Sequence, residues 1–269
     1  MTEESIGFMS CRIEKKNKLE LLFFQDLEQM RFVRHAVFLQ LDAALFSQPA
    51  EKSRSAYRSD PPSPEVDLLR EAGLPAEMLV TLQQVHGTAC HLVKKGDAAT
   101  INGSHGDCLI ASEPSIAIAV KTADCFPILL TNAKERAVAC IHAGWRGIAL
   151  GIVESCLERM SDAFSCSAED AIVAIGPGID RCCYEVKDDA IELFKSRHVD
   201  VEKFLSRNAN GAKMLSLREI IIDKFLRAGV PGDRISHTGL CTFCSALSLP
   251  SFRREGHISR KILSSIMFV

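Results

Sequence analysis

Apolar residues recur along the chain with two different periods, and both predict regular structure. Short runs of apolar, β-branched or alternating residues between turn signals predict β-strands. From residue 79 onward, these runs cover residues 79–85, 115–121, 137–141 and 171–175. Strands therefore recur through the middle of the protein.

Helical periodicity lies between some of these strands. Ile148, Ile152 and Cys156 recur every four residues, and a second row formed by Ala149, Val153 and Leu157 runs beside it, so that we expect a helix ending near residue 160. Two further helices are predicted over residues 188–197 and 215–228. The second of these is stopped by Gly229 and Pro231.

The N-terminal part has a less regular pattern. Residues 18–24 and 32–45 are largely apolar and predict short strands and a helical piece. The polar stretch 47–67 is rich in serine and proline, which predicts a surface loop within a divergent N-terminal segment, residues 1–78. Because strands and helices interleave without a strict β-α-β period, we expect an α+β (mixed α/β) fold. In this fold we expect mixed β-sheets flanked by helices, in a single domain over residues 1–269.

The composition is that of an ordinary globular protein, with 47% hydrophobic and 25% charged residues. The 32 basic and 34 acidic residues leave a formal net charge of −2, which gives no reason to expect nucleic acid or an anionic membrane as a partner. No secretory signal is evident, and the most apolar window, residues 115–130, is broken by Lys121 and Asp124. An odd count of 11 cysteines suits buried thiols in a reducing cytoplasm.

Three segments share one design, in which an apolar run leads to a candidate metal ligand and then to a turn. The ligands are His86 in LQQVHG, Cys125 in VKTADC and His142 in ACIHAG. Two imidazoles and one thiolate suit Zn²⁺ or copper, and three protein ligands leave a position for water or substrate. The spacings are too long for a zinc finger, and each residue could instead fill an ordinary packing role.

Charged residues close to these segments are candidates for substrate contacts. Asp124 precedes Cys125, and it could orient a ligand, bind a substrate hydroxyl or cap a turn. Arg146 lies in the turn Gly144–Gly147 that leads into a helix, where it could bind an anion such as phosphate or form a surface ion pair. A basic group near the C-terminus is either a solvated loop or an anion clamp, and it consists of Arg253, Arg254 and Arg260.

Four further cysteines stand in two short pairs. Cys182 and Cys183 are adjacent, and adjacent cysteines rarely bridge each other, so we interpret them as packing residues. Cys241 and Cys244 have the C-x-x-C spacing. No second C-x-x-C accompanies them, which argues against a zinc ribbon, and a redox pair would lack its usual helix-start context.

Taken in order, the motifs resemble a known family. The segments QQVHG, GDCLIA, VKTADCFPILL, IHAGWRG, AIGPGIDRCCYEV and SFRREG follow one another at the approximate spacing of the YfiH-like proteins. These are also called laccase-domain or polyphenol-oxidase-domain proteins. The resemblance covers roughly residues 79–260, and HAGWRG and TADC are its most specific pieces.

The resemblance implies a compact mixed α/β domain with a zinc site in a surface pocket, formed by His86, Cys125 and His142. It implies a purine nucleoside phosphorylase acting on adenosine, inosine, guanosine and methylthioadenosine, with adenosine deamination as an additional activity of some members. A purine nucleoside and phosphate are then the expected partners of a cytoplasmic monomer or homodimer. Asp124 joins the catalytic candidates, and the phosphate would be positioned by an arginine among Arg146, Arg254 and Arg260.

The N-terminal segment departs from the family pattern. Family members typically carry HGFFTRxGGVS there, with an arginine and two glycines, whereas residues 35–42 of this chain read HAVFLQLD. Gln40 stands where the arginine is expected.

Three alternatives to a zinc phosphorylase stay open. A copper-dependent polyphenol oxidase is compatible with the His₂Cys composition of a blue-copper site. However, none of the eight histidines forms the His-x-His motif with which multicopper laccases build their copper cluster. A metal-free hydrolase would use Cys125 and His142 as a nucleophile–base dyad. A catalytically degenerate binding protein would keep the pocket without turnover.

Overall fold

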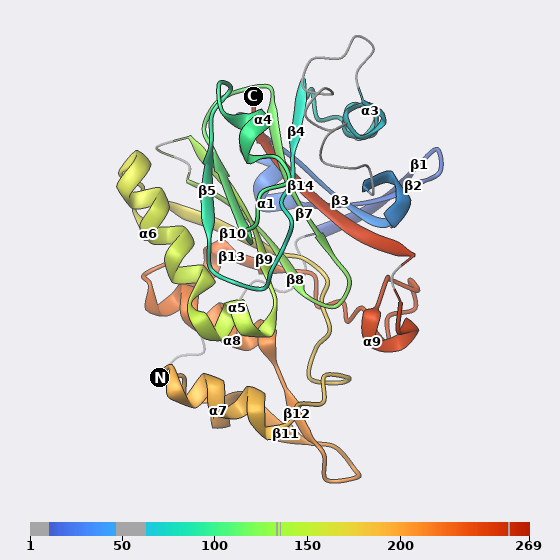
Figure 1. The fold of residues 1–269 in the computed structure, drawn as a ribbon, viewed down its shortest axis with the longest axis vertical. Helices are drawn as coiled ribbons and strands as arrows, with labels where there is room; N and C mark the ends of the chain where they lie inside the picture. Colours follow the sequence, from blue (N-terminus) through green and yellow to red (C-terminus); the bar gives the residue numbers. More distant parts are fainter. Residues whose placement is uncertain (1–10, 47–62, 133, 135, 258) are drawn as a thin grey trace.

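The computed structural model describes residues 11–46, 63–132, 134, 136–257 and 259–269. Within these residues, two six-stranded mixed sheets pack against each other, and helices cover the outer face of each sheet (Figure 1). In spatial order, the first sheet consists of β1 (Cys11–Lys16), β2 (Leu19–Phe24), β3 (Val33–Asp42), β14 (Arg260–Phe268), β7 (Ile116–Thr122) and β4 (Met78–Val80). The second consists of β13 (Ile235–His237), β10 (Ala171–Ile175), β8 (Phe126–Asn132), β9 (Ala137–Ala143), β6 (Cys108–Ala111) and β5 (Cys90–Val93).

The helices fall on opposite sides of this pair of sheets. On the second sheet lie α5 (Trp145–Leu150), α6 (Ile152–Phe164), α7 (Asp188–Ser196) and α8 (Leu217–Arg227), whereas α3 (Pro64–Glu71) packs on the first. The shorter helices are α1 (Gln25–Glu28), α4 (Ala98–Ile101), α9 (Phe252–Glu255) and the 3₁₀ turns η1 (Ala43–Phe46), η3 (Ala168–Asp170), η4 (Val201–Phe204) and η5 (Gly232–Arg234). A small hairpin joins β11 (Leu205–Arg207) to β12 (Lys213–Leu215). The expected α+β fold with mixed sheets and flanking helices is confirmed.

Strands β8 and β9 are buried along their whole length because both of their faces are covered. Successive side chains of a strand point to opposite faces. In β8, Phe126 and Ile128 therefore pack toward the helices, while Leu129 packs toward the other sheet. In β9, Ile141 packs toward the helices and Cys140 toward the other sheet. An unbroken apolar run is what a strand between two cores requires.

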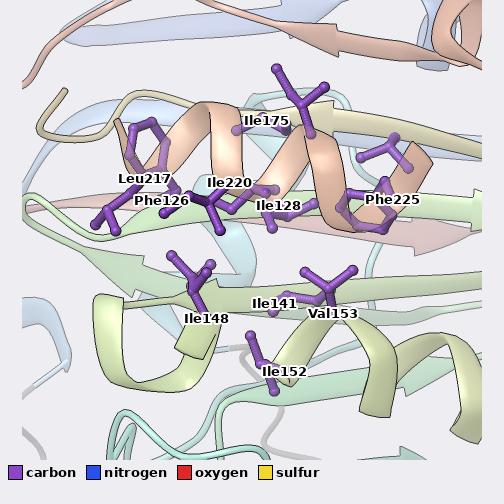
Figure 2. Close-up of a cluster of buried hydrophobic side chains, with 14 of the residues drawn as sticks. Phe126, Ile128, Ile141, Ile148, Ile152, Val153, Ile175, Leu217, Ile220 and Phe225 are labelled. Carbon is purple, nitrogen blue, oxygen red and sulfur yellow. The ribbon is translucent and has the colours of Figure 1, made fainter. Parts of the chain in front are cut away.

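The core on the helical side of the second sheet fixes α5, α6 and α8 on that sheet. Figure 2 shows side chains of this cluster, including Phe126, Ile128, Ile141, Ile148, Ile152, Val153, Leu217, Ile220 and Phe225. Burying one such large side chain contributes about 1.5–3 kcal/mol. The strand ends that lead into α5 are therefore held on a rigid platform.

The helix predicted to end near residue 160 is interrupted at Gly151. This glycine has a φ of +98°, in the left-handed region that other residues avoid, and it separates α5 from α6. The prediction of one continuous helix is therefore wrong at this point. Both predicted apolar rows nevertheless reach the same core, since Ile148 of the first row and Val153 of the second are fully buried in it.

In the first half of the chain, the end of the predicted surface loop differs from the expectation. Residues 47–62 of the predicted loop lie outside the described residues, but its last part is helical, because α3 begins at Pro64. The Ser63 side chain accepts a hydrogen bond from the Val66 N–H, and proline suits the first turn of a helix. The short strands and the helical piece predicted in the N-terminal part are present, since residues 18–24 contain β2, residues 32–45 contain β3, and the short helix α1 lies between these strands. None of the helices in the described residues is long and apolar enough to cross a membrane.

A buried histidine makes the fold sensitive to mild acid. The Nε2 of His35 in β3 accepts the Phe24 N–H at 2.8 Å, and burial, aided by the positive charge of Arg12, lowers the pKa of His35 to about 3. Below the usual pKa of 6.5, the unfolded chain therefore binds a proton that the folded chain rejects. We expect this group to lower the free energy of unfolding by about 1.4 kcal/mol per pH unit as the pH falls from 6.5 toward 3.

Urea denaturation measures how the free energy of unfolding falls with acid. The measurements should cover pH values from about 7.5 to about 4.5, a range that includes the usual histidine pKa of about 6.5. His35→Gln can still accept a hydrogen bond but cannot titrate, so its stability should fall less steeply with acid than that of the wild type. The exposed His257 provides the matched control, His257→Gln, which should keep the wild-type slope. Equal slopes for His35→Gln and the wild type would contradict the assignment.

Candidate metal centre

His86, Cys125 and His142 meet at one edge of the second sheet. His142 is the penultimate residue of β9, and Cys125 directly precedes β8, whose residue Pro127 pairs with His142. The end of β9 and the start of β8 therefore lie side by side. His86 comes from the segment between β4 and β5. The ligand atoms of the three residues all lie within 4.8 Å of one another, and the Cys125 Sγ is 3.6 Å from the His86 Nε2.

The turn that carries His86 is held by the buried carboxylate of Asp107. One oxygen of this carboxylate accepts the His86 N–H at 2.9 Å, and the other accepts the Gly87 N–H at 2.7 Å. The Val85 N–H points to the same group at 3.2 Å. Successive N–H groups that converge on one anion form a nest, and His86 adopts a φ of 60° to complete it. The strand predicted over residues 79–85 ends at Val80, after which the Thr81 N–H donates to the Asn102 side chain and the Gln83 N–H to the Ser104 carbonyl.

The same carboxylate orients His142. The His142 Nδ1 lies 2.8 Å from an Asp107 oxygen, and because a carboxylate only accepts, Nδ1 carries the proton. The other ring nitrogen, Nε2, is thereby left for the cluster. A carboxylate behind a histidine is the usual way to fix the tautomer of a metal ligand and to raise its basicity.

The electrostatics of the cluster favour a thiolate. Burial opposes ionisation of Cys125, but the imidazoles of His142 and His86 outweigh it and lower the pKa of Cys125 to about 7. Burial likewise opposes protonation of His142, but Asp107 and Cys125 raise its pKa to about 9. Burial of Asp107 is outweighed by its hydrogen bonds with His142, Gly87 and His86, which keep the pKa of its carboxyl below the usual value. The thiolate is the form in which cysteine binds metals.

Two glycines allow these segments to approach each other closely. A Cβ on Gly144 would lie 2.5 Å from the His86 ring and 3.1 Å from the Cys125 sulfur. A Cβ on Gly147 would lie 2.8 Å from the carbonyl oxygen of Gly87. Contacts this short are sterically forbidden, so the start of α5 can pack against the His86 turn only because both positions lack a side chain.

Asp124 ties the Cys125 segment to the C-terminal part of the chain. Its carboxylate accepts hydrogen bonds from the Thr242 hydroxyl and from the backbone N–H of Arg253, both at 2.7 Å. Its backbone carbonyl accepts the Ile179 N–H at 2.8 Å. Asp124 thus fixes the backbone beside a ligand through these three contacts.

The arginines proposed from the sequence have different surroundings. Arg146 is exposed, and its guanidinium lies 5.0 Å from the ring of Trp145, the only tryptophan in the sequence. Arg254 donates to the backbone carbonyls of Thr242, Phe243 and Leu249 and pairs with Glu255. Arg260 donates to the Gln40 side chain and lies 3.7 Å from Glu255. Among the described residues, no acidic side chain forms an ion pair with Arg146.

Sequence reasoning missed the role of Asp107 and the contribution of Tyr184. The guanidinium of Arg253 lies 5.3 Å from the centre of the Tyr184 ring. Burial raises the pKa of the Tyr184 hydroxyl, and the charges of Arg253, Cys125 and Asp124 also affect it. Both residues lie in segments that the sequence flagged, GDCLIA and RCCYEV. The position of Asp107 in the GDCLIA motif is the one feature of the sequence that could have indicated its role. Its position before a buried strand is not specific, because a carboxylate there can serve many other purposes.

The donor set fits a single metal ion of intermediate softness. Two imidazole nitrogens and one thiolate converge, and an oriented carboxylate lies behind one of them. In the described part of the chain, the only other group of metal-ligating side chains within such distances contains cysteines alone. The many histidines of a multinuclear copper cluster are therefore not gathered around this site. Two imidazoles and one thiolate suit either Zn²⁺ or a single copper ion.

Comparisons with known proteins connect this geometry to a family. Residues 65–268 match the family described as multi-copper polyphenol oxidoreductase laccase. A purine nucleoside phosphorylase from Bacteroides thetaiotaomicron is 34% identical over 203 residues, which are 72% of this chain and 74% of that protein. An adenosine deaminase, RL5, from an unknown prokaryotic organism is 34% identical over 60% of this chain and 61% of its own length. The crystal structure of YlmD from Geobacillus stearothermophilus shares the fold, with a TM-score of 0.77, 23% identity, and coverage of 95% of this chain and 98% of that one.

Proposed function

The chain belongs to the family described as multi-copper polyphenol oxidoreductase laccase, and from this membership and the site geometry we propose that it is a zinc-dependent purine nucleoside phosphorylase. The observation that carries the proposal is the convergence of His86, Cys125 and His142 in front of the Asp107 carboxylate. The names of its relatives supply the substrate class, a purine nucleoside and phosphate. Adenosine deamination, the activity in the name of one relative, is proposed as a second activity.

In the proposed reaction, a phosphate oxygen forms a bond to the C1′ of the ribose while the bond from C1′ to the purine nitrogen breaks. The purine leaves with the bonding electron pair and takes up a proton, so the products are the free base and ribose 1-phosphate. Bringing phosphate and nucleoside together in one orientation supplies much of the acceleration in such a displacement.

The protein residues are proposed to position the metal and the two substrates. His86, Cys125 and His142 hold the ion, and Asp107 keeps His142 in the tautomer that presents Nε2. When bound, zinc supplies a Lewis acid that polarises an oxygen of the substrates. His86 is exposed, so the cluster opens to solvent on its side and can be reached by a small molecule.

Positive charge for phosphate is proposed to come from Arg146 and Arg253. Arg146 follows Gly144 by two residues and is exposed, and Arg253 stacks on Tyr184 close to Cys125. Arg254 and Arg260, which the sequence also suggested for phosphate, are proposed to hold the segment that presents Arg253. The Arg254 guanidinium donates to three backbone carbonyls and that of Arg260 to the Gln40 side chain, whereas the Arg253 guanidinium donates one hydrogen bond, to the Glu185 carbonyl at 3.3 Å. Asp124 supports this segment from the other side through the Arg253 N–H.

The proposed function is tested by incubating purified, zinc-loaded protein with adenosine in the presence and absence of phosphate. We expect adenine and ribose 1-phosphate to form only when phosphate is present, and inosine to form in either case. Copper-loaded protein offered a phenol and oxygen tests the oxidase alternative and should give no oxidised product. A zinc-loaded sample that forms no purine base from adenosine, inosine or guanosine would refute the proposal, whether or not Gln40→Arg restores turnover.

A further inference from the structure

Four cysteines form a second cluster away from the His86–Cys125–His142 centre. The sulfur atoms of Cys182, Cys183, Cys241 and Cys244 all lie within 4.8 Å of one another, and those of Cys182 and Cys244 are 3.6 Å apart. The sequence showed a C-x-x-C without a second one and therefore argued against a zinc site. In the structure, the adjacent pair Cys182 and Cys183 takes the place of a second C-x-x-C, beyond the packing role that the sequence predicts for them.

The backbone brings the two pairs together before any metal is considered. Gly178 and Cys241 form a parallel β-bridge, in which the Thr242 N–H donates to the Gly178 carbonyl at 3.1 Å. Cys182 and Cys183 follow on the turn that begins at Asp180, where the Cys183 N–H donates to the Asp180 carbonyl at 2.8 Å. The cysteines thus face each other from two turns whose separation is fixed by backbone hydrogen bonds.

The four cysteines differ in how far solvent reaches them. Cys241 is buried, whereas Cys182 and Cys244 are exposed, so an ion could enter from the surface and be held from the interior.

The size of the cluster fits one tetrahedral ion. With a Zn–S distance of about 2.3 Å, four sulfur atoms around zinc are separated by about 3.8 Å. The observed 3.6 Å matches this edge, and the upper limit of 4.8 Å requires only a small contraction. A disulfide would need a separation of about 2.0 Å, and all four thiols are free. An iron–sulfur cluster would spread the sulfurs over separate iron atoms and therefore needs more room.

We propose that Cys182, Cys183, Cys241 and Cys244 bind one zinc ion in a closed, structural four-sulfur site. Four protein ligands leave no position for a substrate, which separates this ion from the open three-ligand centre. Its role is to join two segments, residues 176–187 and 238–251, that contain no named helix or strand. The second segment also carries Thr242, which donates to Asp124 beside Cys125, so the ion stabilises the wall of the catalytic centre.

Metal analysis of the intact protein and three variants tests the site without any assay of activity. The wild type, purified without chelator, should hold two zinc ions per chain. Cys125→Ala, which opens the first centre, should keep one ion, and X-ray absorption of that ion should show only sulfur neighbours at about 2.3 Å. Cys241→Ala combined with Cys244→Ala should lose the other ion, while Cys11→Ser, a change at a half-buried thiol of β1, should keep both.

The measurement on Cys125→Ala keeps the test decisive even if the double variant does not fold. Zinc with nitrogen or oxygen neighbours in this variant, or no zinc at all, would overturn the proposal. So would iron accompanied by inorganic sulfide. Alkylation of the native protein under nitrogen gives a further readout, since zinc should protect the four cysteines until a chelator removes it. A mass showing a disulfide among them would also overturn the site.

Discussion

Replacing Cys125 with serine is expected to lower the rate of adenosine phosphorolysis by roughly a thousandfold. A metal ion contributes several kcal/mol to stabilising charge in a transition state, and about 4 kcal/mol corresponds to that factor. Serine places a neutral hydroxyl where the fold stabilises a thiolate, with the Cys125 pKa lowered to about 7 by its two histidine neighbours. We therefore expect the loss of activity to be accompanied by the loss of one zinc ion per chain.

Rates and zinc content measured on the same samples test this expectation. Cys11→Ser is the matched control, since it makes the same chemical change on β1, and it should keep both rate and zinc. Wild-type protein stripped by a chelator should lose its activity and regain it on addition of Zn²⁺. If Cys125→Ser loses activity but retains its full zinc content, Cys125 is not a ligand, and its assignment as the nucleophile of a Cys125–His142 dyad gains support.

Replacing Asp107 with asparagine is expected to damage both the fold and the metal centre. The Asp107 side chain is completely buried and accepts N–H groups from His86, Gly87 and His142. An asparagine has one acceptor oxygen, and its amide group would face a donor. Leaving buried donors unpaired costs about 3 kcal/mol, and loss of the carboxylate behind a histidine ligand weakens metal binding by about 10–100-fold.

Urea denaturation and competition with a zinc chelator measure the two effects separately. Asp97→Asn is the matched control, because Asp97 is exposed and accepts a single backbone N–H from Lys94, and it should change neither quantity appreciably. Because the pKa of Asp107 is lowered in the folded protein, its contribution is present above the unfolded value of about 3.9 and is lost as the pH falls. An Asp107→Asn protein with wild-type stability and zinc affinity would contradict this role.

The sequence was sufficient for those elements whose side chains follow a simple period. The apolar runs at residues 115–121, 137–141 and 171–175 each became a strand. The helices predicted over residues 188–197 and 215–228 are α7 and α8. In these elements, the pattern of burial along the chain and the local propensity favour the same structure, and no distant residue competes with them.

Prediction was less successful where a contact from elsewhere in the chain decides the local backbone. The run at residues 79–85 has the composition of a strand, yet the N–H groups of Thr81 and Gln83 bond to residues 102 and 104. The Asp107 carboxylate, some twenty residues later, then accepts the N–H groups of residues 85–87. Gly151 interrupts a helix whose apolar rows continue across it. Neither event can be read from periodicity, because periodicity reports which faces are buried and not which backbone groups are paired.

The fold class, the family and three candidate ligands could be predicted from the sequence alone, because burial patterns and motifs are properties of short segments. Which residues meet depends on the tertiary structure. It placed Asp107 behind His142, engaged Arg254 with backbone carbonyls, and joined the adjacent pair at Cys182 to a C-x-x-C some sixty residues away. Such encounters depend on sheet register and on backbone hydrogen bonds between distant turns, which no local pattern encodes.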